Sequence, residues 1–295
     1  MDTTKKSLVT GATGLVGTRL VRALGPNVAV LSRDAKKAER AIGVQAFDWD
    51  GRGPVPEAAL EGVDTVFHLA GESVIGRWND EKKERILASR RDGTRALVKS
   101  IAGKPITLVS ASAVGFYGDR GDEIVDEDSA PGTGFLADVC KVWEAEAAAH
   151  TGRSVSVRVG LVLAPEGGAL KAMLPAFKLG VAGRLGDGKH WQPWIHIDDL
   201  VGIFVHAAKA DVTGALNGTA PNPVTNEVFT KALGSVLHRP TVLPAPAFAL
   251  KLVLGEMGGI VLASQRAVPK RTQASGYTFR FPEIDTALRD LLGAR

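Results

Sequence analysis

Short apolar runs alternate with longer amphipathic segments over the first three quarters of the chain. The apolar runs predict seven strands, at residues 7–9, 27–31, 45–49, 64–71, 106–112, 154–159 and 215–219. Between them, apolar positions three or four residues apart predict helices, of which 79–101 and 134–150 are the longest. Strands that are apolar along their length have both faces covered. The alternation therefore predicts an α/β fold, a Rossmann-type doubly wound parallel sheet.

A glycine turn joins the first predicted strand to the first predicted helix. Gly11, Gly14 and Gly17 are spaced three and three apart, between the apolar run 7–9 and the helical pattern 15–24. Strand, glycine turn and helix form the context of a dinucleotide site, in which backbone N–H groups and the helix N-terminus face the phosphates. The residues expected to bind the cofactor here are Gly11, Thr13, Gly14, Leu15, Val16 and Gly17.

The pattern changes after Pro165, where glycine and proline become frequent. We expect residues 1–165 to form the dinucleotide-binding domain, with 195–220 returning to it. Residues 166–295 otherwise form a smaller C-terminal substrate lobe. A loop rich in glycine, polar and aromatic residues, 183–194, is predicted to cover the substrate cleft at the carboxyl edge of the sheet.

The end of the second predicted strand bears on the choice of cofactor. An acidic residue there favours NAD, whereas a basic residue accommodates the 2′-phosphate of NADP. Here the first charged residue after the strand is Arg33, and Ser32 is an additional donor. The sequence therefore favours NADP over NAD. The alternative is that Arg33 pairs with Asp34 at the surface.

Other strand ends supply further candidates for cofactor contact. Asp48 and Trp49 fall where an adenine would lie, although a strand-end carboxylate and a packing aromatic explain them equally well. Residues Leu69, Ala70 and Gly71 end the fourth strand and are expected beside the cofactor ribose. His68 is interpreted as a core histidine. Arg90 lies on the helix 79–101, where that helix can approach the cofactor.

Composition and charge narrow the class of protein. The chain has 295 residues, 45% hydrophobic and 23% charged, with a net charge of +4 and one cysteine, Cys140. No Lys/Arg block is present, so a small-molecule substrate is expected and nucleic acid is not. The N-terminus lacks a signal-peptide pattern, and Lys251 and Glu256 interrupt the apolar stretch 248–263. These features predict a cytoplasmic protein without a membrane segment; a homodimer is compatible with them.

Several dispersed motifs resemble those of the extended short-chain dehydrogenase/reductase superfamily. Besides the glycine turn, these are residues 66–71, 110–112, 117–118 and Lys141. The atypical branch named epimerase family proteins is closer still. Its likeness rests on residues 71–73, 77–78, 89–91, 134–136, 143–144, 194–200, 220–226, 239–240 and 255–257. The resemblance covers nearly the whole chain and implies a Rossmann lobe, a C-terminal substrate lobe and NADP(H) binding.

One departure from the superfamily concerns its catalytic pair, Tyr-x-x-x-Lys with an upstream serine. In that pair the tyrosine transfers the proton, while the lysine lowers the tyrosine pKa and binds the nicotinamide ribose. Lys141 matches the lysine position, Ala137 stands at the tyrosine position, and Ser110 or Ser112 matches the serine. The resemblance therefore implies an intact cofactor half and an altered acid–base half.

Substitutes for the missing tyrosine exist elsewhere in the chain. Tyr117 follows the fifth strand and could reach the cleft, and a packing role is the alternative. His190 and His196 titrate near neutral pH, and a structural hydrogen bond is the alternative for His196. Cys140 is expected to be a buried thiol. The sequence has no Cys/His cluster of the kind that would predict a metal site.

Two functions follow from these observations. One is an NADP-dependent oxidoreductase or epimerase-like enzyme that acts on a small polar substrate. A sugar-linked or nucleotide-linked compound is one candidate for this substrate. The other is a non-catalytic NADP(H)-binding protein that senses the state of the cofactor. In the first case the residues expected to line the cleft are Arg90, Lys141, Trp191, Trp194 and His196.

Overall fold

The computed structural model describes residues 6–293, apart from the side chains of Lys251, Val253 and Leu254. Its centre is a seven-stranded sheet in the order β11-β7-β5-β4-β1-β2-β3, with every neighbouring pair parallel. The strands are β1 (Lys6–Thr10), β2 (Val28–Ser32), β3 (Ala46–Asp48), β4 (Val63–His68), β5 (Thr107–Ala113), β7 (Ser154–Val159) and β11 (Gly214–Gly218). The predicted Rossmann-type doubly wound sheet is confirmed, and all seven strands lie where the apolar runs predict them.

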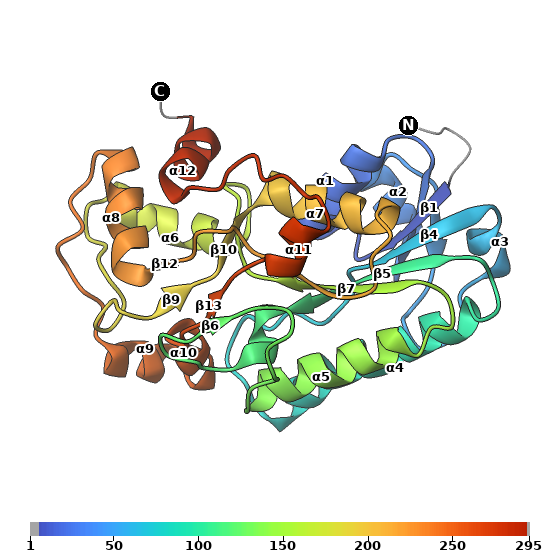
Figure 1. Cartoon of the computed structure of the whole chain (residues 1–295), viewed down its shortest axis with the longest axis horizontal. Coiled ribbons are helices and arrows are strands. Elements are labelled where there is room, and N and C mark those ends of the chain that lie inside the picture. Colours follow the sequence, from blue (N-terminus) through green and yellow to red (C-terminus); the bar gives the residue numbers. More distant parts are fainter. Residues whose placement is uncertain (1–5, 294–295) are drawn as a thin grey trace.

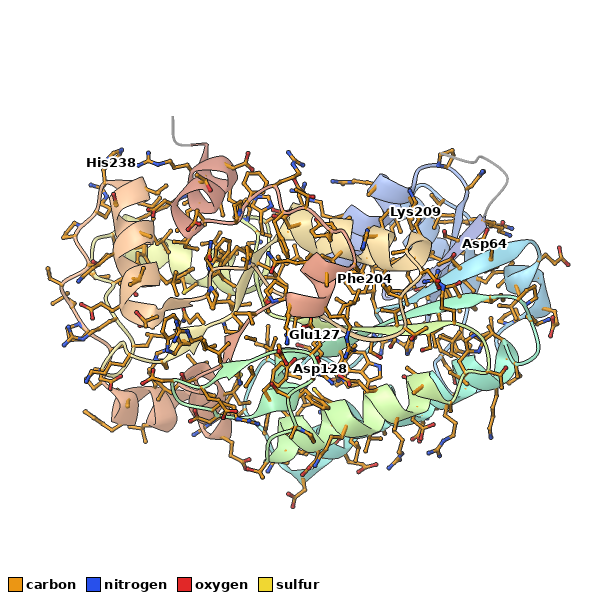
Figure 2. The ribbon with its side chains drawn as sticks, viewed as in Figure 1. Asp64, Glu127, Asp128, Phe204, Lys209 and His238 are labelled. Carbon is orange, nitrogen blue, oxygen red and sulfur yellow. The ribbon has the colours of Figure 1, made fainter. Side chains whose placement is uncertain are left out.

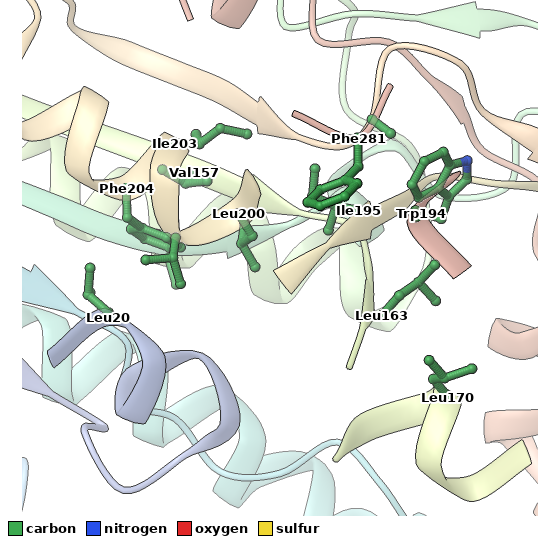
Figure 3. Close-up of a cluster of buried hydrophobic side chains, with 14 of the residues drawn as sticks. Leu20, Val157, Leu163, Leu170, Trp194, Ile195, Leu200, Ile203, Phe204 and Phe281 are labelled. Carbon is green, nitrogen blue, oxygen red and sulfur yellow. The ribbon is translucent and has the colours of Figure 1, made fainter. Parts of the chain in front are cut away.

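Helices cover both faces of this sheet (Figure 1). One face carries α4 (Asp80–Ser100) and α5 (Phe135–Ala148), with α3 (Glu57–Leu60) near its edge. The other carries α1 (Leu15–Leu24), α2 (Ala35–Ile42) and α7 (Ile197–Lys209). Alternate residues of a strand therefore enter different cores. Leu8 packs in the cluster with Leu97 of α4, while Val9 packs in the cluster with Leu20 of α1 and Phe204 of α7 (Figure 3).

Polar side chains define where the long helices begin. Asn79 accepts a hydrogen bond from the Lys82 N–H at the start of α4, as a residue at that position should. Asp34 does the same for α2 through the Lys37 N–H. These contacts satisfy backbone donors that have no partner inside their own helix.

The C-terminal lobe lies at one end of the sheet (Figure 1). Its helices are α6 (Gly168–Lys178), α8 (Asn226–Leu237), α9 (Ala247–Leu254), α10 (Glu256–Val261), α11 (Lys270–Ala274) and α12 (Ile284–Leu292). Three pairs of short strands accompany them: β8 (Leu161–Leu163) with β10 (Trp194–His196), β9 (Trp191–Gln192) with β12 (Val224–Thr225), and β6 (Ile124–Val125) with β13 (Arg266–Ala267). The segment expected to return to the first domain contains α7 and β11, and β11 is an edge strand of the main sheet.

A buried polar cluster joins this lobe to the sheet. The Glu127 carboxylate accepts hydrogen bonds from the backbone N–H groups of Asn217, Arg271 and Thr272, at 3.0 to 3.2 Å. Figure 2 shows Glu127 and the neighbouring Asp128 beside α11. These contacts fix α11 against β11. None of the helices within residues 6–293 combines the length and apolar character needed to cross a membrane.

Candidate functional site

The glycine turn is packed too tightly for side chains at two of its three glycines. Gly11 has φ +69°, and a Cβ there would lie 2.8 Å from the Leu69 carbonyl group. A Cβ on Gly17 would overlap the carbonyl oxygen of Gly11. Gly11 therefore lets the turn lie against the end of β4, and Gly17 lets α1 lie against the turn.

Gly14 faces outward instead. It is the N-cap of α1 and is exposed, and no side chain caps the helix there. A Cβ on Gly14 would find one neighbour within 4 Å, the Gly11 oxygen at 3.3 Å. The first turn of α1, which starts with Leu15, Val16 and Gly17, thus presents its N–H groups to open space. A helix terminus of this kind attracts anions.

A cavity of about 640 Å³ borders this terminus. Its walls are Thr13, Gly14, Leu15, Thr18, Arg19, Arg22, Glu166 and Gly167. Arg19 forms ion pairs with Glu166 at 2.8 Å and with Asp198 at 3.5 Å, which connects α1 to the loop after β8 and to the start of α7. We call this cavity the turn pocket.

Behind the turn, a buried histidine positions the end of β4. Thr10 and His68 are paired in register on β1 and β4, and the Thr10 hydroxyl lies 2.8 Å from His68 Nδ1. The same hydroxyl oxygen accepts the N–H groups of Leu69 and Ala70 at 3.1 and 3.0 Å, so its own proton goes to Nδ1. The opposite ring nitrogen, Nε2, then donates to Thr94 Oγ1 at 3.0 Å.

This hydrogen-bonding pattern needs neutral His68. Burial lowers its pKa from 6.5 to about 4, and the charge of Arg90 adds to the shift. The interpretation of His68 as a core histidine agrees with this environment. Its contacts hold residues 69–70 against Gly11, at the edge where the expected cofactor residues converge.

The end of β2 presents a basic residue, as expected. Arg33 is exposed, whereas the Asp34 carboxylate is occupied as the N-cap of α2. Among the ion pairs of residues 6–293, none joins Arg33 to Asp34. Arg33 instead helps to lower the pKa of Glu72, after the larger effect of the hydrogen bond from Lys82. The Ser32 hydroxyl is bonded locally, to the Asp34 carbonyl at 3.1 Å.

Two other candidates near this edge have structural contacts. Asp48 Oδ1 accepts the Ala35 N–H at 2.8 Å, and so supports the start of α2. Trp49 is 8% exposed, packs edge-on against His68 and donates its indole N–H to the Gly53 carbonyl. Of the two interpretations of Trp49, the packing aromatic agrees with its buried ring.

Arg90 lies directly beneath the end of β4. A Cβ on Gly71 would be 3.1 Å from the Arg90 guanidinium carbon. That guanidinium donates to the Glu72 carbonyl at 3.0 Å and lies over the Trp143 ring at 4.8 Å. Burial lowers the Arg90 pKa. Arg90 supports the edge of the sheet and does not line either pocket described here.

A second cavity, of about 260 Å³, opens at the N-terminus of α5. We call it the α5 pocket. Its walls are Trp78, Gly115, Gly118, Asp119, Thr133, Gly134, Phe135, Leu136, Ala137, Glu256, Gly259, Ile260, Ala263 and Gln265. Ala137, at the position of the superfamily's tyrosine, is thus a wall of a pocket. Lys141 follows one turn later on the same helix and is paired with Asp138 at 2.6 Å.

The serines and the cysteine lie behind this pocket. Ser112 donates its hydroxyl proton to Glu144 Oε1 at 2.6 Å, and Ser110 donates to the Ala111 carbonyl at 3.1 Å. Both serines are at most 2% exposed. Burial raises the pKa of the Cys140 thiol to about 11, as suits a buried and unreactive cysteine.

Tyr117 lines neither pocket, and of its two interpretations the packing role agrees with the structure. It lies in η1 (Val114–Tyr117), and its side chain is 0% exposed. Its hydroxyl donates to Asn217 Oδ1 at 2.7 Å and accepts from Arg158 at 3.0 Å. Burial raises its pKa to about 12. Arg158 continues the chain of contacts to Glu144, so Tyr117 belongs to the polar cluster that joins the lobe to the sheet.

His196 and Trp194 are also inside the protein and not in a cleft. His196 is the N-cap of α7: its Nδ1 accepts the Asp198 N–H at 3.0 Å, and its ring stacks on Phe281 at 3.9 Å. Burial lowers its pKa. Trp194 is 0% exposed and lies in the buried hydrophobic cluster (Figure 3). Its indole N–H donates to the Asn222 carbonyl. Both residues begin the return of the chain to the main sheet.

The loop 183–194, expected over the cleft, is bonded into the C-terminal lobe. Its backbone pairs with other parts of the C-terminal lobe, for example Leu185 N–H with Asn226 Oδ1 at 2.7 Å and Gly186 N–H with the Ala245 carbonyl at 2.8 Å. No residue of this loop lines either pocket. The Trp191 indole N–H donates to Asp122 Oδ1 at 2.9 Å.

The α9–α10 hairpin of the C-terminal lobe borders the α5 pocket. Glu256, Gly259 and Ile260 of α10 line the α5 pocket, together with Trp78 from the loop before α4. Sequence patterns did not assign a role to these residues. The signal present was the family resemblance of residues 77–78 and 255–257, which marked them without saying what they face. Within the described residues, no three His, Cys, Asp or Glu side chains gather as a metal site.

Comparisons with known proteins agree with this architecture. The family model described as NAD dependent epimerase/dehydratase family matches residues 7–219, and a domain of unknown function, DUF1731, matches residues 245–291. The epimerase family protein YfhF of Bacillus subtilis is 38% identical, over 97% of this chain and 98% of its own length. Human epimerase family protein SDR39U1 is 36% identical, over 97% of this chain and 99% of its own.

Solved structures give the same result. The crystal structure of human SDR39U1 (isoform2) with NADPH has a TM-score of 0.87 and 35% sequence identity, covering 98% of this chain and 99% of that chain. A nucleoside-diphosphate sugar epimerase of Corynebacterium glutamicum has a TM-score of 0.79 and 36% identity, covering 99% of this chain and 59% of that chain. The resemblance read from the dispersed motifs is confirmed, and the chain belongs to the NAD dependent epimerase/dehydratase family.

Proposed function

We propose that the chain binds NADP(H) at the glycine turn and acts as an oxidoreductase or epimerase-like protein on a small molecule. The observation that carries this proposal is the uncapped N-terminus of α1, where Gly14 leaves the helix N–H groups open to the turn pocket. A pyrophosphate is an anion that such a terminus binds well. The NADPH in the human relative's structure supports the same assignment.

The residues present fit a dinucleotide. Gly11 and Gly17 make the turn compact, and the space above Gly14 is the cradle that a side chain would fill. The backbone from Thr13 to Gly17 would hold the pyrophosphate, while residues 69–71 would lie along the ribose. When bound, the cofactor supplies or accepts a hydride; the chain supplies position and charge.

Arg33 supports NADP(H) over NAD(H). Its guanidinium is exposed at the end of β2, while the nearby Asp34 and Asp48 carboxylates are occupied by backbone N–H groups of α2. A 2′-phosphate there would meet a cation with a free approach, and a ribose 2′-OH would find no unoccupied carboxylate among these two.

The surroundings of Ala137 and Lys141 support a second candidate function, a non-catalytic protein that binds or senses NADP(H). Ala137, which is 1% exposed, borders the α5 pocket and has no proton to donate, and the Ser112 proton is already donated to Glu144. Lys141 remains one turn from Ala137 and could contact a ribose. The chain thus has the groups that bind and orient a cofactor, but it lacks the usual proton donor beside them.

Fluorescence titration of the purified protein with NADPH and NADH tests the proposal. We expect saturable NADPH binding that is tighter than NADH binding. Incubation of the NADPH complex with a panel of carbonyl compounds then separates the two candidates. Stoichiometric oxidation with any compound supports the enzyme, binding without oxidation supports the sensor, and no binding of either cofactor refutes both. We also propose the cytoplasm as its compartment, since its single cysteine is a buried free thiol.

A further inference from the structure

The α5 pocket is built from two distant parts of the chain. Phe135, Leu136 and Ala137 belong to α5, whereas Glu256 and Ile260 belong to α10 in the segment matched by the domain of unknown function. The two parts enclose one cavity of about 260 Å³. The C-terminal segment is therefore a wall of the space next to Ala137, where a substrate would meet the cofactor.

Specific contacts hold this wall in place. The Ser264 N–H donates to Asp119 Oδ1 at 3.2 Å, and Gln265 Nε2 donates to the Gly118 carbonyl at 2.8 Å. On the other side, Glu256 is paired with Lys83 of α4 at 2.6 Å. The hairpin is thus attached to the sheet domain at both edges of the pocket.

The charge of the lining is acidic. The lining includes two acidic residues, Asp119 and Glu256, and none of its described residues is Lys, Arg or His. Lys83 compensates Glu256, while the Asp119 carboxylate has backbone N–H partners, Gly121 and Ser264. The α5 N-terminus adds a partial positive charge, smaller than the charge of either carboxylate. A diphosphate needs several charge-assisted donors, and these walls do not provide them.

The size and the remaining walls point to a compact ligand with an apolar face. Trp78 and Phe135 lie edge to face at 5.1 Å, and Ile260 and Ala263 add aliphatic surface. Pockets for drug-sized ligands occupy roughly 300–1,000 Å³, so a cavity of about 260 Å³ suits a smaller molecule.

We infer that the C-terminal segment makes the α5 pocket selective for compact, uncharged or cationic substrates with an apolar or aromatic face, and that nucleoside-diphosphate sugars are excluded. This inference rests on the proposed function, because the α5 pocket is taken as its substrate site. It gives the segment of unknown function a role, the choice of substrate by size and charge.

Binding of matched probes to the full-length protein tests the inference. Phenylethylamine, 2-phenylethanol and phenylacetate have similar size and differ in charge, and UDP-glucose represents nucleotide sugars. Saturation-transfer NMR with NADPH present should show the amine and the alcohol bound, phenylacetate weaker and UDP-glucose absent. UDP-glucose bound more tightly than the compact probes, or no binding by any of them, would overturn the inference.

Two variants locate the site of binding. A Cβ on Gly259 has nothing within 4 Å, so Gly259→Trp should fill the pocket and abolish probe binding, whereas Gly259→Ala should retain it. Asp119→Asn keeps an oxygen acceptor for the two backbone N–H groups and should tighten phenylacetate binding about threefold to tenfold. Probe binding unchanged in Gly259→Trp, or phenylacetate binding unchanged in Asp119→Asn, contradicts the inference.

The cofactor titration keeps this test separate from the proposed function. NADPH affinity should stay within about twofold in Asp119→Asn and Gly259→Ala, because neither residue lines the turn pocket and neither change fills the space beside Ala137. Native protein that does not bind NADPH refutes the proposed function, while the probe series still reports on the α5 pocket. Normal NADPH binding together with a preference for UDP-glucose refutes the inference alone.

Discussion

The turn pocket and the α5 pocket are built in different ways. The turn pocket is lined mainly by one continuous stretch, residues 13–22, which includes the glycine turn, with Glu166 and Gly167 added from one loop. The α5 pocket is assembled from four separate segments, Trp78 and residues 115–119, 133–137 and 256–265. A backbone site depends on glycine spacing and on the helix that follows, whereas a side-chain site can be altered at one position without affecting the turn.

This difference is consistent with a chain that has the family's glycine turn but lacks the superfamily's catalytic tyrosine. At the turn, a Cβ on Gly11 or Gly17 would strike backbone atoms, so those positions are constrained by packing as well as by binding. Beside Lys141, Ala137 is compatible with an intact helix and sheet, and what is missing relative to tyrosine is one side-chain phenol, the proton donor. The four predictions below break or sharpen this contrast, from the largest expected effect to the smallest.

Restoring the missing hydroxyl should have the largest effect. Ala137→Tyr places a phenol in the α5 pocket, one turn before Lys141. General acid catalysis contributes about 10²–10⁴-fold, and we expect a gain of that size in NADPH-dependent reduction of a reactive dicarbonyl. The rate is followed by NADPH absorbance.

Ala137→Phe is the matched control, with the same ring and no hydroxyl. It should stay at the native rate, and thermal melts of both variants will show whether the ring overpacks α5. If native protein already reduces substrates briskly, and Tyr117→Phe or His196→Ala stops the reaction, the proton donor lies elsewhere and the contrast fails.

Filling the cradle should abolish cofactor binding. Gly14→Val places a branched side chain where the phosphates would lie, and we expect NADPH affinity to fall by about 100-fold or more, which corresponds to roughly 2.7 kcal/mol. The fold should persist, because Gly14 has φ −77° and a Cβ there meets one atom, at 3.3 Å.

Gly53→Val serves as the control, since a Cβ on Gly53 has nothing within 4 Å and lies outside both pockets. Circular dichroism should be native for both variants. Undiminished NADPH binding by Gly14→Val would mean that the turn does not hold the cofactor.

Acid should weaken the support of the turn through His68. Its folded pKa, about 4, lies below its ordinary value of 6.5, so the unfolded chain takes up a proton before the folded chain does. This contribution is complete above pH 6.5 and is lost as the pH falls toward about 4. Since each pKa unit corresponds to about 1.4 kcal/mol, the loss should reach about 3 kcal/mol.

Urea unfolding at several pH values measures this loss. His68→Gln should reduce the pH dependence of the unfolding free energy, whereas His238→Gln, at an exposed residue of the C-terminal lobe (Figure 2), should leave it unchanged. An identical pH dependence in native protein and His68→Gln would assign the acid sensitivity to other groups.

Removing the basic residue at β2 should have the smallest effect and should be specific to one cofactor. Arg33→Ala should weaken NADPH binding by about one to two decades, because a charge-assisted bond contributes roughly 1.5–3 kcal/mol, and NADH binding should be unchanged. Arg40→Ala, an exposed arginine on the neighbouring α2, is the control. Equal affinities of the native protein for NADPH and NADH would mean that Arg33 does not bind the 2′-phosphate.

Local patterns were sufficient for the central sheet. Its seven strands and the start of α4 at Asn79 follow from apolar runs and one capping residue, since strand and helix signals are short in range. The pairing of β6 with β13 was not predicted. Each of these two strands has two residues, and they lie more than 100 positions apart in the chain.

The residues of the candidate site also divide into those set by local sequence and those set by long-range contacts. The sequence by itself determined the glycine turn, the basic residue after β2 and the absence of tyrosine at residue 137, because each depends on neighbours in the chain. Only the tertiary structure decided that Tyr117 and His196 are buried, and that α10 borders the same pocket as Ala137. Those outcomes depend on contacts such as that of Asp119 with Ser264, between segments whose approach no local pattern encodes.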